Sequence, residues 1–175
     1  EDNRSILKRI TESELFQRIN FTKADIERYV DRKTVVQVIA LLSGRDMSFS
    51  GKDMKLYMRE IGKTPIDPVI VSEIEKSAEY MMEGFQDWTL NMYKRLKKSV
   101  VPSLFVAARK AQEKNLSAAE FGQWAQKFLI DEYDKDSEFG ETLSRKTANK
   151  EVIQRRTDLM VQDLEAFANS LAQGN

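Results

Sequence analysis

Apolar residues recur at steps of three and four along most of this sequence, and this spacing constrains the fold more than any other feature. A clear example runs through Val71, Ile74, Ala78, Met81 and Phe85. Residues spaced in this way share one face of an α-helix, whereas a half-buried strand would alternate at every second residue. Only 7 Gly and 3 Pro interrupt the pattern. We therefore predict an all-α fold, a helical bundle of about six to seven helices.

Three predicted helix starts carry the same signal. Thr22, Ser50 and Ser117 are each followed three residues later by a carboxylate, with an apolar residue just before the hydroxyl and another four positions after it. The hydroxyl can accept a hydrogen bond from the first turn, the carboxylate can reach back to the cap amide, and the apolar pair can pack together. We predict this capping box at all three starts. The same spacing at Thr11 and Glu14 predicts a restart of the first helix.

Turn signals divide the helical pattern into segments. Pro65 cannot continue a helix, whereas Asp67 and Pro68 suit the cap and the first position of the next one. This break separates a predicted N-terminal helical lobe, residues 1–64, from a main helical bundle, residues 67–175, with one continuous domain as the alternative. We predict a loop within the polar residues 131–151. The predicted helices cover residues 5–19, 23–42, 51–61, 68–99, 102–115 and 118–133, and a last amphipathic helix ends before Gly174.

The sequence contains no His and no Cys, which removes most familiar catalytic chemistry. Histidine is the commonest metal ligand and a frequent general base, and cysteine supplies thiol nucleophiles and thiolate ligands. Catalytic triads with histidine, zinc hydrolase motifs and histidine-ligated haem are therefore excluded. We expect no enzymatic activity, no cofactor and no bound metal ion.

Charge and hydropathy limit the partners. The 28 Lys and Arg balance 28 Asp and Glu, which weakens long-range attraction to nucleic acid or anionic lipid. No apolar run approaches the roughly 20 residues that span a bilayer, so we expect a soluble protein without a transmembrane segment. The chain begins at Glu1 rather than Met, which indicates a processed or trimmed product. We expect it in the cytoplasm or, after removal of a signal peptide, in the periplasm or outside the cell.

Two motifs resemble ligand sites but lack required residues. Gly62-Lys63-Thr64 matches the end of a phosphate-binding loop, yet Tyr57 stands where that motif needs a glycine, so we predict a helix end. An acidic run resembles a calcium loop, but Phe139 replaces its turn glycine and Arg145 its final glutamate. We predict a solvated loop for this run, which comprises Asp131, Glu132, Asp134, Asp136, Glu138 and Glu141.

Three glutamates, Glu75, Glu79 and Glu83, lie at four-residue steps on one face of a predicted helix. Helical bundles can build di-metal sites from inward-facing glutamates, but those sites also need paired histidines, which this chain lacks. The three residues avoid the apolar seam of the helix. We therefore predict a solvent-facing acidic stripe.

The predicted helix over residues 68–99 carries flexible thioethers and large rings at Met81, Met82, Phe85, Trp88 and Met92. Methionine repacks easily and is common on surfaces that accept varied apolar partners. One interpretation is a groove that binds an amphipathic helix or an acyl chain. Helical spacing does not separate a groove from a core, because both use the same period. The alternative is therefore a bundle core, packed by the last helix through Met160, Leu164 and Phe167.

One dense basic cluster follows the seam, at Lys94, Arg95, Lys97 and Lys98. It suggests contact with nucleic acid or with membrane headgroups. The alternative is a helix C-terminus, where cations offset the partial negative charge of the last carbonyl groups. Pro102, shortly after the cluster, favours this alternative.

These observations predict a non-catalytic helical interaction protein of the bacterial adaptor, accessory, chaperone or immunity type, which binds another protein or an apolar ligand. The alternative is a nucleic-acid-binding regulator that uses the helices over residues 23–42 and 51–61 as a helix-turn-helix. The connection of about seven residues between them is long for that motif, which usually has three or four. Nucleic acid is therefore the less favoured partner.

Overall fold

The computed structural model describes residues 1–132 and 136–174, and this part of the chain contains helices and no strands. The prediction of an all-α fold is confirmed. No helix among these residues combines the length and the apolar character needed to cross a membrane. The helices are α1 (Asn3–Thr11), α2 (Glu14–Arg18), α3 (Lys23–Glu27), α4 (Val30–Leu42), α5 (Gly51–Ile61), α6 (Pro68–Gly84), α7 (Leu90–Tyr93), α8 (Val101–Glu113), α9 (Ala118–Asp131), α10 (Glu138–Ser144) and α11 (Lys150–Gln173).

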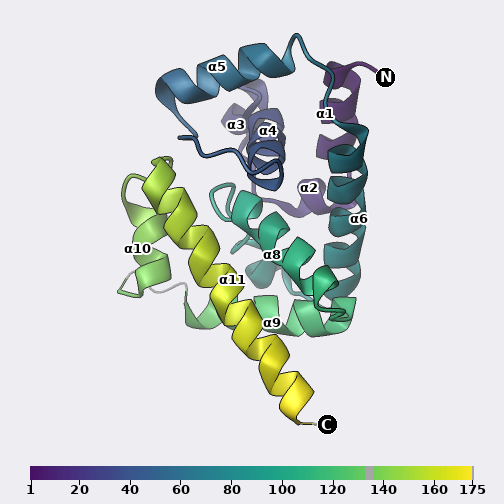
Figure 1. Cartoon of the computed structure of the whole chain (residues 1–175), viewed down its shortest axis with the longest axis vertical. Coiled ribbons are helices and arrows are strands. Elements are labelled where there is room, and N and C mark those ends of the chain that lie inside the picture. Colours follow the sequence, from purple (N-terminus) through teal and green to yellow (C-terminus); the bar gives the residue numbers. More distant parts are fainter. Residues whose placement is uncertain (133–135, 175) are drawn as a thin grey trace.

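Helix α8 lies at the centre of the bundle (Figure 1). It packs against α4, α6 and α11, and α11 crosses it along much of its length. Three alanines on α8, Ala107, Ala108 and Ala111, are fully buried. Their small side chains allow neighbouring helices to approach closely on several sides. Helix α9 crosses the end of α6, whereas α1 and α6 form one side of the molecule, with α2 packed on α6.

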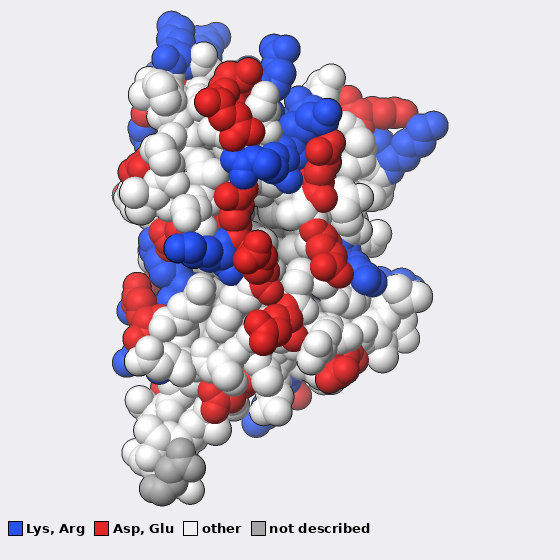
Figure 2. Space-filling model, turned by 90° about the vertical axis from the view of Figure 1, so that its right-hand side faces the viewer, with Lys and Arg blue, Asp and Glu red and all other residues white. Residues whose placement is uncertain are grey.

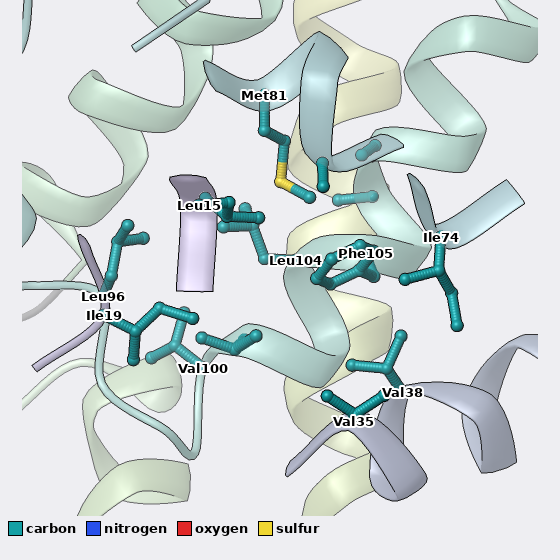
Figure 3. Close-up of a cluster of buried hydrophobic side chains, with 14 of the residues drawn as sticks. Leu15, Ile19, Val35, Val38, Ile74, Met81, Leu96, Val100, Leu104 and Phe105 are labelled. Atoms are coloured by element: carbon teal, nitrogen blue, oxygen red, sulfur yellow. The ribbon is translucent and has the colours of Figure 1, made fainter. Parts of the chain in front are cut away.

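Helices from both sides of Pro65 surround one core (Figure 3). Leu15 of α2 and Val35 of α4 belong to the same buried cluster as Leu104 and Phe105 of α8. The packing of α4 on α8 joins the two parts of the chain further. This arrangement favours one continuous domain, and the division into a lobe over residues 1–64 and a bundle over residues 67–175 stays a prediction.

Two of the predicted capping boxes are present in full, at Thr22 and Ser117. The third prediction, at Ser50, is wrong in its contacts although α5 begins where expected. The Ser50 side chain makes no capping hydrogen bond, and the Asp53 carboxylate accepts from the amide of Ser48 instead, at 3.1 Å. Gly51 takes a left-handed φ of 60°, so the chain enters α5 by a different path from a standard box.

The predicted restart at Thr11 is also wrong. Thr11 is the last residue of α1, and its hydroxyl donates to the carbonyl of Lys8 at 2.8 Å instead of capping a new helix. Helix α2 begins at Glu14, with Ser13 in the cap position. The chain therefore turns between α1 and α2, which brings this turn against α6.

Two predicted helices are longer than the observed elements. The helix expected over residues 23–42 is interrupted at Tyr29, whose φ of 57° is left-handed. The helix expected over residues 68–99 ends at Gly84, where α6 meets α9. A Cβ atom on Gly84 would overlap the carbonyl oxygen of Ala118, and one on Gly122 would overlap that of Gly84. The glycines thus allow direct backbone contact between α6 and α9.

A short helix, α10, lies within residues 131–151, a segment in which the sequence predicts a loop but no helix. The Ser137 hydroxyl caps it by accepting from the amide of Gly140 at 2.9 Å. The Phe139 side chain is buried and packs edge-on against Phe128, with ring centroids 4.8 Å apart. This long-range contact stabilises a helix whose local composition favours a loop.

Arg156 of α11 is buried and connects three segments. Its guanidinium donates to the carbonyl oxygens of Ser99, Thr142 and Thr147 at 2.9, 2.6 and 2.8 Å. Burial lowers the pKa of this guanidinium to about 10, so it remains charged at neutral pH. The carbonyl of Thr142 belongs to the last turn of α10, where free acceptors favour a cation. Arg156 therefore fixes α10 and the residues before α8 against α11.

Candidate functional site

Four of the five seam residues proposed from sequence lie in the core. Met81 and Phe85 are fully buried, and Trp88 and Met92 are 8% and 7% exposed. The Phe85 and Trp88 rings stack with centroids 3.8 Å apart. These positions match the core alternative. Partner binding by these four residues stays a prediction, and it would require the core to open. Met82 differs from them, because it is only partly buried.

Both α9 and α11 contribute to the buried cluster that contains the seam. Phe121 of α9 packs against Phe85, with ring centroids 6.0 Å apart, and α9 is a main neighbour of α6. Met160 and Leu164 of α11 are fully buried, but α11 packs chiefly on α8. Helical periodicity alone did not identify α9 as a neighbour of the seam, because it does not show which helix packs on an apolar face.

The basic cluster is engaged in contacts within the protein. Lys98 pairs with Asp25 of α3 at 2.7 Å, and Lys98 and Thr22 together lower the pKa of the Asp25 carboxyl. Arg95 donates to the carbonyl of Leu129, in the last turn of α9, at 3.0 Å. The predicted pairing of cations with helix-end carbonyls thus occurs, but on α9 rather than on the preceding helix. Binding of nucleic acid or headgroups by Lys94, Arg95, Lys97 and Lys98 stays a prediction.

The structure also shows where the two motifs that resemble ligand sites lie. Gly62 is the C-cap of α5, and its amide donates to the carbonyl of Met58 at 3.1 Å, which confirms the predicted helix end. Asp134 of the acidic run lies outside the described residues. Within residues 1–132 and 136–174, no group of three or more carboxylates is placed to hold a metal ion.

A hollow with a volume of about 440 Å³ lies between the turn joining α1 to α2 and the side of α6. Figure 2 shows this side of the molecule, with acidic side chains gathered down its middle. The floor of the hollow is apolar. Its base consists of buried core residues, Ile10, Leu15, Ile74 and Ala78, and Met82 is the floor residue that is partly exposed. Its rim is mainly acidic and consists of Glu12, Glu14, Glu75 and Glu79, with Arg9 and Ser13 beside them.

The rim carboxylates differ in their pairing. Arg9 pairs with Glu75 and, at 2.7 Å, with Glu1. Glu12 and Glu14 have only long contacts, of 3.7 and 3.9 Å, with basic residues four positions away on exposed helix faces. Such exposed pairs contribute little, about 0.3–0.5 kcal/mol on a helix. Glu79 forms no ion pair with any residue that the structure describes.

Ser13, beside the rim of the hollow, carries a hydroxyl without a hydrogen-bond partner in the part of the chain that the structure describes. Its hydroxyl oxygen is buried, caps no amide of α2 and has no hydrogen-bond partner among the described residues. Most buried polar side-chain atoms have such a partner, and leaving one unpaired costs about 1–3 kcal/mol. The Ser13 oxygen is closed off from solvent, so the hollow combines an apolar floor with a carboxylate, Glu79, that has no ion-pair partner among the described residues.

Sequence reasoning found one half of this hollow. It placed Glu75, Glu79 and Glu83 on a solvent-facing stripe without a binding role, and it singled out Met82 for partner binding. Glu75, Glu79 and Met82 line the hollow. It missed the other half, because the turn at Ser13 and its packing on α6 depend on long-range contacts. Comparison of the chain with family models, curated proteins and solved structures finds no match.

Proposed function

We propose that this chain is a non-catalytic interaction protein, and that it binds a partner protein through the hollow between α1, α2 and α6. The observation that carries the proposal is an apolar floor of five side chains within a rim of four carboxylates. Grooves that accept a partner helix seat its apolar side chains over an apolar floor. The hollow, at about 440 Å³, has such a floor and carries polar groups at its rim.

The carboxylates of the rim suit recognition better than catalysis. Acid–base work by paired carboxylates usually requires one of them to be buried, so that its pKa rises toward neutrality. Glu12, Glu14 and Glu79 are exposed, and the Glu75 side chain is 37% exposed beside the guanidinium of Arg9. All four carboxylates therefore lie at the edge of an apolar surface, where cations of a partner can reach them.

The proposal can be tested with peptides selected against the full chain. A library of random 16-residue peptides is displayed on phage, and binders are measured by calorimetry against the wild type and Met82→Lys. Because Met82 lines the hollow and is partly buried, lysine can keep its apolar stem in place while its ammonium group blocks the site. We expect Met82→Lys to weaken the selected peptides at least tenfold.

The matched control is Ile130→Lys, which makes the same kind of change at a 47% exposed residue of α9 that does not line the hollow. It is expected to leave binding unchanged. Thermal unfolding of both variants checks that the fold is retained. If every selected peptide binds Met82→Lys as tightly as the wild type, the hollow is not the binding surface.

A further inference from the structure

We infer that the occupant of the hollow is an amphipathic helix of a partner protein, with a row of Lys or Arg beside a row of apolar side chains, and that Arg9 competes with this basic row. The inference rests on the proposed function and names the chemistry of the partner. It is carried by two parallel rows of side chains on α6 and by the pairing of Arg9.

The first row is acidic. Glu75, Glu79 and Glu83 lie at four-residue steps along α6, which places successive carboxylates about 6 Å apart along the helix axis. Glu79 and Glu83 are exposed, and neither forms an ion pair with any described residue. A second helix alongside α6 would present cations four residues apart with the same repeat. The row is therefore complementary to the basic face of a helix that lies alongside α6.

The second row is apolar and runs next to the first. Ile74, Ala78 and Met82 also lie at four-residue steps, and all three line the hollow. Ala78 is the smallest of them and leaves room between α6 and the apolar residues that face it from α1 and α2. Met82 can change its rotamer to fit different side chains. Ile74 and Ala78 are buried at the base of the hollow, and Met82 is the exposed member of this row. Apolar side chains of a partner helix can thus enter the hollow against Met82 while the neighbouring basic row meets the glutamates.

Arg9 already occupies part of the acidic row. Its guanidinium pairs with Glu75 and Glu1, and it is the only cation that lines the hollow among the described residues. A basic residue of the partner must share Glu75 with Arg9, whereas Glu79 and Glu83 are open to it. Removal of Arg9 is therefore expected to strengthen binding, although it deletes a residue of the site.

The test uses the peptides selected in the display experiment. We expect the binders that Met82→Lys weakens to be rich in Lys or Arg at four-residue spacing, beside an apolar row. Glu79→Gln is expected to weaken them about two- to fivefold, the size of an exposed ion pair, and Arg9→Gln to tighten them by a similar factor. Circular dichroism of each peptide with the protein is expected to gain helical signal on binding.

Two controls separate site effects from net charge. Glu151→Gln on α11 removes an exposed carboxylate away from the hollow, and Lys23→Gln on α3 removes a cation whose side chain is 92% exposed. Neither is expected to alter binding at 0.15 M salt, where charges more than about 8 Å apart are largely screened.

The outcomes distinguish this inference from the proposed function. Binders that Met82→Lys weakens but that carry no basic row, or that respond to Glu79→Gln no more than to Glu151→Gln, overturn the inference and leave the hollow as a binding site. Weaker binding to Arg9→Gln overturns the role of Arg9 as a competitor. Binders that are insensitive to Met82→Lys overturn the proposed function itself.

Discussion

Replacement of Arg156 with methionine is expected to lower the free energy of unfolding by about 2–4 kcal/mol. The methionine keeps most of the apolar stem but removes three hydrogen bonds from a charged donor to the carbonyls of Ser99, Thr142 and Thr147. The bond to Thr142 is buried and the other two are partly buried. Leaving one buried acceptor unpaired costs about 1–3 kcal/mol, and the partly buried acceptors cost less because water can reach them. The substitution also removes the desolvation cost of a buried charge, which offsets part of the lost stability.

The assay is urea unfolding followed by circular dichroism at 222 nm, at pH 7, with Arg155→Met as the matched control. Arg155 is the neighbouring residue on α11, but its side chain is 52% exposed and forms a surface pair with Glu138 at 2.5 Å. Its replacement is expected to change the free energy of unfolding by less than about 0.5–1 kcal/mol. If Arg156→Met is no less stable than Arg155→Met, the assigned role of the guanidinium is refuted.

Three further predictions concern stability. Gly122→Ala is expected to cost about 1–3 kcal/mol of stability, because its Cβ atom would overlap the backbone of Gly84. The control Gly62→Ala is expected to be nearly neutral, because Gly62 has a φ of −71° and the nearest atom to its added Cβ would be 3.4 Å away. Equal melting temperatures for the two variants would contradict the assigned α6–α9 contact. Ser117→Ala is expected to cost about 1 kcal/mol by removing the cap of α9, and urea unfolding with no loss would be the contrary result. Burial raises the pKa of the Tyr80 hydroxyl, which donates to the carbonyl of Leu116 at 2.9 Å. The folded protein therefore keeps this proton above pH 10 while the unfolded chain loses it, so stability falls as pH rises above about 10. Tyr80→Phe is expected to reduce this loss, and an unchanged pH dependence would contradict it.

The sequence predicted features that depend on neighbours along the chain. The boxes at Thr22 and Ser117 need only residues within one turn, and both are present. The box at Ser50 failed because Gly51 redirects the backbone, and a left-handed glycine leaves no mark in helical spacing. The end of α6 at Gly84 depends on its crossing with α9, which lies more than thirty residues further along the chain.

The candidate site also combines features that depend on neighbours along the chain with features that depend on long-range packing. The acidic and apolar rows of α6 follow from their four-residue spacing, so sequence analysis could identify them. The part of the hollow formed by Ile10, Ser13 and Leu15 depends on how the turn between α1 and α2 packs on α6. The packing of the seam was difficult to predict for the same reason, because helical spacing identifies an apolar face but does not show which helix packs on it. Only the structure distinguishes Met82, at the hollow, from Met81, in the core.

This difference between neighbouring methionines gives the most direct test of the proposed binding surface. The chain has 7 Met, and labelling with ¹³C-methyl methionine provides a separate NMR signal for each. On addition of a selected peptide, the Met82 methyl signal is expected to shift most, whereas those of Met81 and Met92 stay close to their free positions. Large shifts at Met81 and Met92 with little change at Met82 would show that the partner opens the core seam, and would contradict binding at the hollow.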